Sequence, residues 1–314
     1  MSKSKARYQC AAEVFAGWRD EVLCGTPPTL YPVSDGDGEL ARIEIGPGLV
    51  TLVGGAPGSG KTAFTMQLVV DALRLTPTLR AVCCNVEMTP AVLLDRQLAR
   101  LSGIDLNTIR HRKVGTEHPD HIDLAMNTLE TFAERLAFVR PPFDLANVVA
   151  TADAFQADLI LLDYIQRIRP PGAHGDRRAS VDATMDYLRQ FADAGVAVLV
   201  VAAVARTKDR KGRSSYDGDG LNLASFRESS ELEFGADDAF ILVPNTKANT
   251  EFVMLRHLKA RYTEMADIAL RFDRCRQQFT PVSSAEEIKP DMDKLRAVWN
   301  CTPPADETDG GVRK

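Results

Sequence analysis

The sequence lacks the cysteine patterns that build disulfide frameworks and zinc sites. It holds six cysteines and five histidines, yet no two cysteines form a C-x-x-C pair and none stands at metal-ligand spacing from a histidine. Long apolar runs are also missing, because the stretch 196–205 is too short to cross a bilayer and is typical of a central strand. We therefore expect a protein of a reducing compartment, without a structural zinc site or a membrane span.

Two further absences concern the start of the chain and its charge. Residues 1–7 are basic but are followed by mixed polar sequence instead of an apolar segment, which argues against secretion and favours the cytoplasm. The formal net charge of −5 argues against a surface coated with basic residues. A protein of net negative charge can still enclose nucleic acid in a pore whose lining alone is positive. The net charge is therefore weak evidence for or against nucleic-acid binding.

Residues 55–62, GAPGSGKT, fit the phosphate-loop pattern G-x-x-x-x-G-K-[ST] without a mismatch. An aliphatic run precedes them and a helical pattern follows, so strand, glycine loop and helix occur in the required order. Backbone N–H groups would then surround the phosphates, Lys61 would reach the β and γ oxygens, and Thr62 would ligate Mg²⁺. The alternative is a glycine-rich turn that precedes Lys-Thr by chance. The predicted cofactors are ATP and Mg²⁺, with the nucleotide held by Gly55, Ala56, Pro57, Gly58, Ser59, Gly60, Lys61, Thr62 and Ala63.

Strand-like segments recur along the chain, and helical patterns separate several of them. Such alternation predicts an α/β domain with a mostly parallel sheet flanked by helices. Segments 159–162 and 196–203 are continuously apolar, which indicates strands buried on both faces. The predicted strand segments are 50–53, 80–86, 136–139, 159–163, 196–203, 239–243 and 252–258.

Both ends of the chain differ from this pattern. Residues 11–24 have apolar positions at helical spacing and precede Gly-Thr-Pro-Pro, which predicts a short amphipathic helix outside the sheet domain. After Phe279 the sequence is polar and acidic, with one candidate helix at 292–299. We divide the chain into an N-terminal linker or docking helix, an ATPase domain and a polar, largely flexible tail, at 1–26, 27–280 and 281–314.

Two acidic residues end strand-like segments. Asp163 follows Leu159-Ile-Leu-Leu, the Walker B pattern, and is placed to ligate Mg²⁺. Glu87 closes another apolar segment and is a candidate general base that orients the attacking water. In a doubly wound sheet we expect that strand end to lie beside the phosphate loop. The alternative for Glu87 is an ordinary glutamate at a helix N-terminus.

These motifs and others resemble, in order, those of the C-terminal motor domain of DnaB-type replicative helicases. The resemblance covers residues 25–279. Asp-Tyr-Ile-Gln after the Walker B strand, and Arg-Glu-Ser ahead of an acidic Ala-Asp-Asp strand, are not general features of phosphate-loop proteins. The segments that carry it are 54–64, 85–89, 159–166, Phe226-Arg-Glu-Ser-Ser, Lys259-Ala-Arg, and Leu270-Arg-Phe-Asp followed by Phe279.

The resemblance implies a RecA-like domain that assembles as a homo-oligomeric ring, commonly a hexamer, with ATP bound between neighbouring subunits. Lys259 and Arg261 match the family's K-x-R, whose arginine acts as a finger on the neighbour's γ-phosphate. Without the family, Lys259 and Arg261 are alternate residues on one face of a strand, which is typical of a solvated edge. The helix at 11–24 would be the linker helix that packs on the adjacent motor.

The resemblance also indicates contacts to single-stranded DNA. Arg227, Glu228 and Ser230 match a family loop that contacts the DNA backbone. Segment 206–213 carries five positive charges and one negative, and in the family it borders the central pore. A solvated surface turn is the alternative for this segment. Its candidate DNA contacts are Lys208, Arg210 and Lys211, and a second candidate pair, Arg177 and Arg178, lies in the glycine-bearing loop after Asp163.

The sequence departs from the family pattern at three points. The family's sensor strand ends in Ser-Gln, where the glutamine links the γ-phosphate to the DNA loops, whereas Ala203 stands here and its side chain forms no hydrogen bond. Ser230 replaces a usual glycine, which restricts the backbone of the DNA loop. The family's N-terminal collar domain has no counterpart before Gly25. We therefore expect coupling between DNA and hydrolysis to be weak or routed elsewhere.

The predicted function is an ATP-dependent, ring-forming motor on single-stranded DNA, a DnaB-type helicase or translocase that hydrolyses ATP at subunit interfaces. Its predicted partners are single-stranded DNA and further copies of the chain, with no membrane. The alternative is a RecA-superfamily regulatory ATPase that controls assembly or a protein partner without strand separation, which Ala203 favours and Arg227 opposes. A P-loop kinase for a small molecule is disfavoured because no lid-like segment with acceptor-binding residues stands out.

Overall fold

The computed structural model describes residues 9–36, 38–114, 119–172, 175–204, 207–208, 214–215, 226, 235–245 and 251–282. Several predictions lie outside these residues, namely Arg210, Lys211, Arg227, Glu228, Ser230 and the helix at 292–299. For Arg177 and Lys208 the backbone alone is described.

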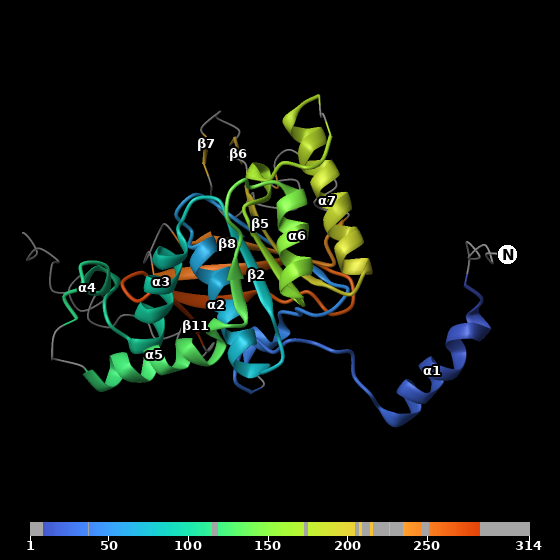
Figure 1. The fold of residues 1–314 in the computed structure, drawn as a ribbon, viewed down its shortest axis with the longest axis horizontal. Helices are drawn as coiled ribbons and strands as arrows, with labels where there is room; N and C mark the ends of the chain where they lie inside the picture. Colours follow the sequence, from blue (N-terminus) through green and yellow to red (C-terminus); the bar gives the residue numbers. More distant parts are fainter. Residues whose placement is uncertain are drawn as a thin grey trace, which may run out of the picture.

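A nine-stranded sheet forms the centre of the fold (Figure 1), in the spatial order β11-β10-β9-β8-β1-β5-β4-β2-β3. Its parallel part comprises β8 (Asp238–Pro244), β1 (Val50–Gly55), β5 (Ala197–Ala203), β4 (Leu159–Asp163), β2 (Ala81–Asn85) and β3 (Leu136–Phe138). Its antiparallel extension comprises β9 (Phe252–Ala260), β10 (Ile268–Asp273) and β11 (Gln278–Pro281). This architecture confirms the predicted α/β fold with a mostly parallel sheet.

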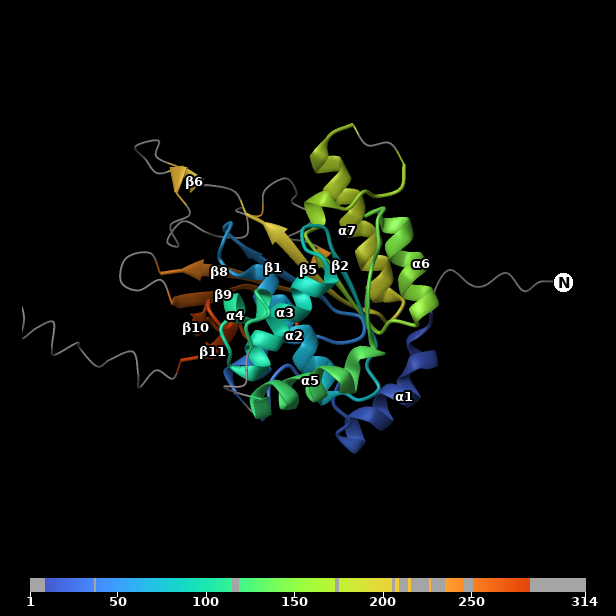
Figure 2. The same ribbon diagram turned by 60° about the vertical axis from the view of Figure 1, so that its left-hand side comes forward.

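Helices cover both faces of the sheet (Figure 2). One face packs against α2 (Lys61–Leu75), α3 (Pro90–Ser102) and α5 (Pro119–Ala133), and the other against α6 (Leu145–Phe155) and α7 (Arg177–Asp193). Shorter elements connect them: η1 (Glu39–Arg42), α4 (Leu106–Arg110) and η2 (Ile165–Arg167). β6 (Thr207–Lys208) lies in the basic segment 206–213 and pairs with β7 (Ser214–Ser215), which follows that segment, as a two-stranded ribbon.

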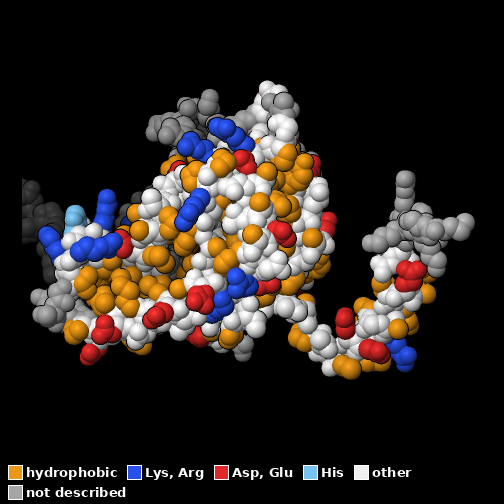
Figure 3. All heavy atoms as spheres, in the orientation of Figure 1, with side chains coloured by type: hydrophobic (Ala, Val, Ile, Leu, Met, Phe, Trp, Pro, Cys, Tyr) orange, Lys and Arg blue, Asp and Glu red, His pale blue; other side chains and the backbone are white. Residues whose placement is uncertain are grey.

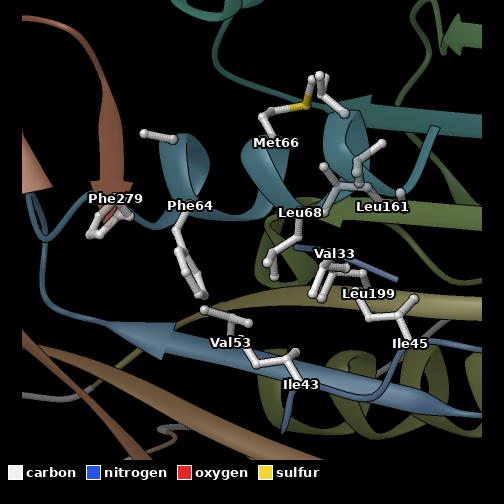
Figure 4. Close-up of a cluster of buried hydrophobic side chains, with 14 of the residues drawn as sticks. Val33, Ile43, Ile45, Val53, Phe64, Met66, Leu68, Leu161, Leu199 and Phe279 are labelled. Atoms are coloured by element: carbon white, nitrogen blue, oxygen red, sulfur yellow. The ribbon is translucent and has the colours of Figure 1, made fainter. Parts of the chain in front are cut away.

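The alternation of side chains along the central strands explains this layering. In β1, Val53 faces the α2 side, whereas Leu52 faces the side of α6 and α7. Figure 4 shows Phe64 and Leu68 of α2 among the side chains packed with Val53 on its side of the sheet. Every residue of β4 is buried, and β5 is buried except at its last residue, which confirms the predicted burial of these strands on both faces.

The predicted N-terminal helix is present as α1 (Ala11–Cys24), and it ends at Gly25 in the left-handed conformation. Figure 1 shows α1 standing away from the sheet domain. Within the described part of the chain, α1 contributes no buried residue, and Figure 3 shows apolar side chains along it. The exposed large apolar residues of α1 are Val14, Phe15, Trp18, Val22 and Leu23. The division of the chain at 26 and 280 stays a prediction.

The predicted loop placement of Arg177 and Arg178 is wrong. Both residues belong to the first turn of α7, because the Asp176 side chain caps this helix by accepting a 2.8 Å hydrogen bond from Ala179 N.

Among the described residues, no helix is both long and apolar enough to cross a membrane.

Candidate functional site: a nucleotide pocket at the carboxyl edge of the sheet

The phosphate loop joins the end of β1 to the start of α2. Gly58 and Gly60 both adopt positive φ, at 77° and 91°, which favours glycine. A Cβ on Gly60 would also lie 2.7 Å from the Phe279 ring and 2.8 Å from the Phe272 ring. These rings stack on each other with centroids 4.1 Å apart. The β10–β11 hairpin therefore packs directly against the loop and leaves no room for a side chain.

Within the loop, Lys61 is held close to the backbone. Its Nζ donates 2.9 Å hydrogen bonds to the carbonyl oxygens of Gly55 and Ala56. Burial lowers the pKa of Lys61, and the nearby carboxylates of Asp163 and Glu87 oppose that shift. Ser59 Oγ is buried and has no hydrogen-bond partner among the described residues. A half-buried ammonium and a buried hydroxyl beside a glycine backbone fit a phosphate ligand.

Asp163 closes β4 inside the same region. It is buried, and burial raises its pKa, against which the Thr62 hydrogen bond and the Lys61 charge act. A hydroxyl next to a carboxylate is the pair of hard oxygen ligands that Mg²⁺ takes from a protein while phosphate and water supply the rest. The described residues contain no cluster of three or more His, Cys, Asp or Glu that would hold a metal by itself. The residues present therefore fit a nucleotide-bound Mg²⁺.

Asn85, the last residue of β2, connects Asp163 to the turn that carries Glu87. Its Nδ2 donates a 2.7 Å hydrogen bond to Asp163 Oδ2, and its Oδ1 accepts from Glu87 N at 3.0 Å and from Met88 N at 2.7 Å. Sequence reasoning gave Asn85 no role. The residue lies within the quoted motif around Glu87, but the bond to Asp163 joins residues distant in the chain and leaves no local signal.

The expectation that the strand end before Glu87 lies beside the phosphate loop is confirmed, although the two strands themselves are not neighbours in the sheet. β1 pairs with β5 and β8, and β2 is separated from β1 by β5 and β4. Glu87 nevertheless lines the same pocket as Lys61, because the carboxyl ends of these parallel strands meet at one edge of the sheet.

The pocket measures about 410 Å³ and brings together the predicted phosphate, metal and general-base residues, Lys61, Thr62, Asp163 and Glu87. Pro57, Gly58, Gly60 and Ala63 also line it, whereas Gly55, Ala56 and Ser59 are not among its lining residues. The remaining lining residues, apart from Ala203, were missed by sequence reasoning: Met88, Arg96, Tyr164, Phe272, Arg274 and Gln277.

Two of these missed residues are arginines with specific surroundings. Arg96 of α3 is partly buried with Asp163 close enough to counteract the lowering of its pKa by burial, and its Nε has no hydrogen-bond partner among the described residues. Arg274 donates a 3.0 Å hydrogen bond from Nη1 to Gly58 O. It comes from the β10–β11 turn, so its approach to the phosphate loop has no signature in the local sequence. Both add positive charge to the pocket.

Ala203 ends β5 and lines the pocket, where the family pattern has glutamine. Its backbone is fixed by Gln166, whose Oε1 accepts from Ala203 N at 3.1 Å and whose Nε2 donates to Ala203 O at 3.2 Å. The main chain at this position is therefore tied to the segment after Asp163, although the alanine side chain has no polar atom.

Lys259 and Arg261 lie far from this pocket. β9 ends at Ala260, so Arg261 follows the strand, which corrects the prediction that both residues share it. Lys259 Nζ donates to Ala236 O at 2.7 Å, and Arg261 Nη1 forms a 2.8 Å ion pair with Asp237 Oδ1. Asp237 Oδ2 also accepts from the backbone N of Val50, at the opposite end of β1 from the phosphate loop. A strand of this length separates the two ends by roughly 15–20 Å.

The fold and the pocket define a RecA-like ATPase domain. Residues 45–281 match the family model for the DnaB-like helicase C terminal domain, and the chain belongs to this family. It therefore carries a helicase-type ATPase motor domain. Among solved structures, one titled as an ATPase domain aligns with a TM-score of 0.75 at 17% identity, covering 88% of this chain and 100% of that one.

A second solved structure, titled as a DnaB-like replicative helicase and its interactions with primase, aligns with a TM-score of 0.71 at 16% identity. The alignment covers 89% of this chain and 68% of that one. At these identities the likeness supports the fold. No match was found among curated proteins.

Proposed function

We propose that this protein is an ATP-dependent motor on single-stranded DNA that assembles as a homo-oligomeric ring and hydrolyses ATP at subunit interfaces. The observation that carries the proposal is the single pocket that holds Lys61 and Thr62 of the phosphate loop together with Glu87 and Asp163. This is the set that nucleotide hydrolysis requires: a cation for the phosphates, two oxygen ligands for Mg²⁺ and a carboxylate for the attacking water.

Each residue has a distinct role in this proposal. When bound, ATP with Mg²⁺ supplies the phosphoryl group that is transferred to water. Lys61 neutralises phosphate charge, Thr62 and Asp163 hold the metal, and Glu87 orients the water and accepts its proton. Asn85 positions both carboxylates, because it bonds the Asp163 side chain and the backbone of Glu87.

The placement of Arg261 supports hydrolysis between subunits. Arg261 lies near the amino end of β1, whereas the pocket lies at its carboxyl end, so a finger from this residue has to come from another copy of the chain. The exposed apolar side chains of α1 are a second surface that association with another copy would cover. DNA contacts through 206–213 and 227–230, and location in the cytoplasm, stay predictions from the sequence.

A regulatory ATPase that acts on a protein partner without strand separation is the second candidate. Ala203 favours it, because the pocket wall at the sensor position offers no side-chain hydrogen bond through which DNA and γ-phosphate would communicate.

ATP turnover with and without single-stranded DNA, measured beside the oligomeric state, tests the proposal. We expect DNA-stimulated turnover in an oligomer, and loss of turnover in Lys61→Ala and Glu87→Gln by at least about 10²-fold. Unchanged turnover in either variant would remove the assigned active site. A monomeric protein whose ATP turnover is the same with and without DNA would contradict the motor proposal and favour the regulatory alternative.

A further inference from the structure

Phe226 is buried at 2% exposure. It directly precedes Arg227, the residue proposed to contact DNA. The Phe226 side chain belongs to the apolar cluster between the sheet and helices α6 and α7, together with Val204 and Ala202. The residue that precedes the proposed DNA contact is therefore part of the core.

The anchor lies directly against β1. A Cβ added to Gly54 would overlap Phe226 Cε1, and it would lie 2.9 Å from Phe226 Cζ and 3.0 Å from Val204 Cγ1. Real Cβ atoms do not approach other atoms this closely, so the ring occupies the space that the missing side chain of Gly54 leaves. Phe226 thus lies against the main chain of β1, in the same apolar cluster as Val204, the residue that follows β5.

Gly54 and Val204 each adjoin a residue that supports or lines the nucleotide pocket. Gly54 precedes Gly55, whose carbonyl oxygen holds Lys61 Nζ at 2.9 Å. Val204 follows Ala203, which lines the pocket and whose backbone is held by Gln166. A displacement of the Phe226 ring would therefore act on the strand that leads into the phosphate loop.

We propose that Phe226 is a positioning residue that couples DNA occupancy to ATP hydrolysis by packing against Gly54, within the apolar cluster that includes Val204. The inference rests on the proposed function and gives its pocket a means of regulation. A glutamine at the sensor position would couple the two sites by hydrogen bonds, which Ala203 cannot form. A close-packed core transmits small displacements because it has no free volume to absorb them, and the ring on bare backbone is such a contact.

The test compares wild type with Phe226→Leu, a conservative variant that keeps an apolar side chain. Three quantities are measured: turnover without DNA, affinity for a fluorescent oligothymidylate, and the ratio of turnover with and without saturating oligothymidylate. We expect the first two to be unchanged and the ratio to fall by about fivefold or more. A purely structural role would lower turnover without DNA as well.

Phe132→Leu is the matched control, because Phe132 is an equally buried phenylalanine on the opposite face of the sheet. It is expected to keep the stimulation ratio. Gly54→Ala supplies a reciprocal test, because the added methyl clashes with the Phe226 ring and should lower the stimulation ratio below that of wild type. The double variant Gly54→Ala with Phe226→Ala removes the clash and should recover part of the stimulation ratio.

The outcomes separate the two proposals. Stimulated wild type together with an equally stimulated Phe226→Leu would overturn the coupling role of Phe226 and leave the motor function standing. Equal loss of the ratio in Phe132→Leu would also overturn it, because the effect would then be general to the core. Wild type that neither binds oligothymidylate nor responds to it would overturn the motor function itself.

Discussion

Asn85 and Asp163 end neighbouring strands in direct register, and Asn85 Nδ2 donates a 2.7 Å hydrogen bond to Asp163 Oδ2. The same amide fixes the backbone that carries Glu87. We expect Asn85→Ala to lower turnover by about 10–100-fold, because the metal carboxylate and the catalytic turn lose a shared support. Turnover measured over a Mg²⁺ titration checks this.

Asn85→Asp separates the two functions of the amide. Its oxygens can still accept from the backbone of Glu87 and Met88, but it offers Asp163 a second carboxylate instead of a donor. We expect it to be no more active than Asn85→Ala. Wild-type turnover and Mg²⁺ dependence in both variants would show that the bond to Asp163 has no part in the reaction.

Arg261→Ala is expected to lower turnover by about 10³-fold while nucleotide binding is retained. The reason is the distance between Arg261 and its own pocket, which places any action on the γ-phosphate in another subunit. Mixing Arg261→Ala subunits with Lys61→Ala subunits tests this, because some interfaces in mixed oligomers then combine an intact phosphate loop with an intact arginine. Turnover should reappear on mixing. A mixture as inactive as its components would contradict action across an interface.

Alanine substitution at Gly58 and Gly60 should have unequal effects. Both residues have positive φ, so each substitution costs about 1–2 kcal/mol in backbone strain. A Cβ on Gly58 has nothing within 4 Å, whereas one on Gly60 meets the rings of Phe272 and Phe279. We expect Gly60→Ala to lose about 1–3 kcal/mol more in the free energy of unfolding. Urea unfolding checks the difference, and equal losses would show that the hairpin does not support the loop.

Glu44 gives a prediction about pH. Burial raises the pKa of Glu44, and the charge of Asp238 raises it further. A raised carboxyl pKa means that the folded state holds the proton more tightly than the unfolded chain. The free energy of unfolding therefore falls as the pH rises from 4.5, the ordinary pKa of a glutamate, through the pKa of Glu44 in the folded state. Glu44→Gln should therefore stabilise the protein at neutral pH by about 0.5 kcal/mol, a figure that allows for solvent screening.

This gain should vanish as the pH falls below 4.5, where Glu44 carries its proton in both states. Thermal unfolding at several pH values measures it. Glu130→Gln, on the exposed face of α5, is the control for the loss of one negative charge from the surface. A gain that persists unchanged at low pH would contradict the electrostatic origin.

Much of the fold follows from local patterns. Each predicted strand segment overlaps a strand of the sheet, with ends shifted by at most two residues, because continuous apolar runs and strand–loop–helix order are local properties. The end of the antiparallel extension near Arg261 was harder to predict from the sequence. Its strand ends at Ala260, since the β9–β8 pairing stops opposite Asp238. Pairing partners, unlike apolar runs, are not written into the neighbouring residues.

The candidate site also contains residues that the sequence predicts and residues that only the structure reveals. Lys61, Thr62 and Asp163 stand in motifs whose residue spacing carries the chemistry, and the structure brings them into one pocket. Arg96 and Arg274 have no such spacing. They reach the pocket because α3 packs on the sheet and the β10–β11 hairpin packs against the phosphate loop, and both arrangements depend on contacts between distant segments.

The sequence by itself determined a phosphate loop, its acidic partners and a DnaB-like order of motifs, because each is a short pattern set by backbone geometry and residue chemistry. Tertiary structure decided that Asn85 joins Asp163 to Glu87, that Arg261 lies beyond reach of its own pocket, and that Phe226 fills the space beside Gly54. These relationships arise where the sheet and its covering layers bring distant segments into van der Waals and hydrogen-bond contact, and a one-dimensional pattern does not record them.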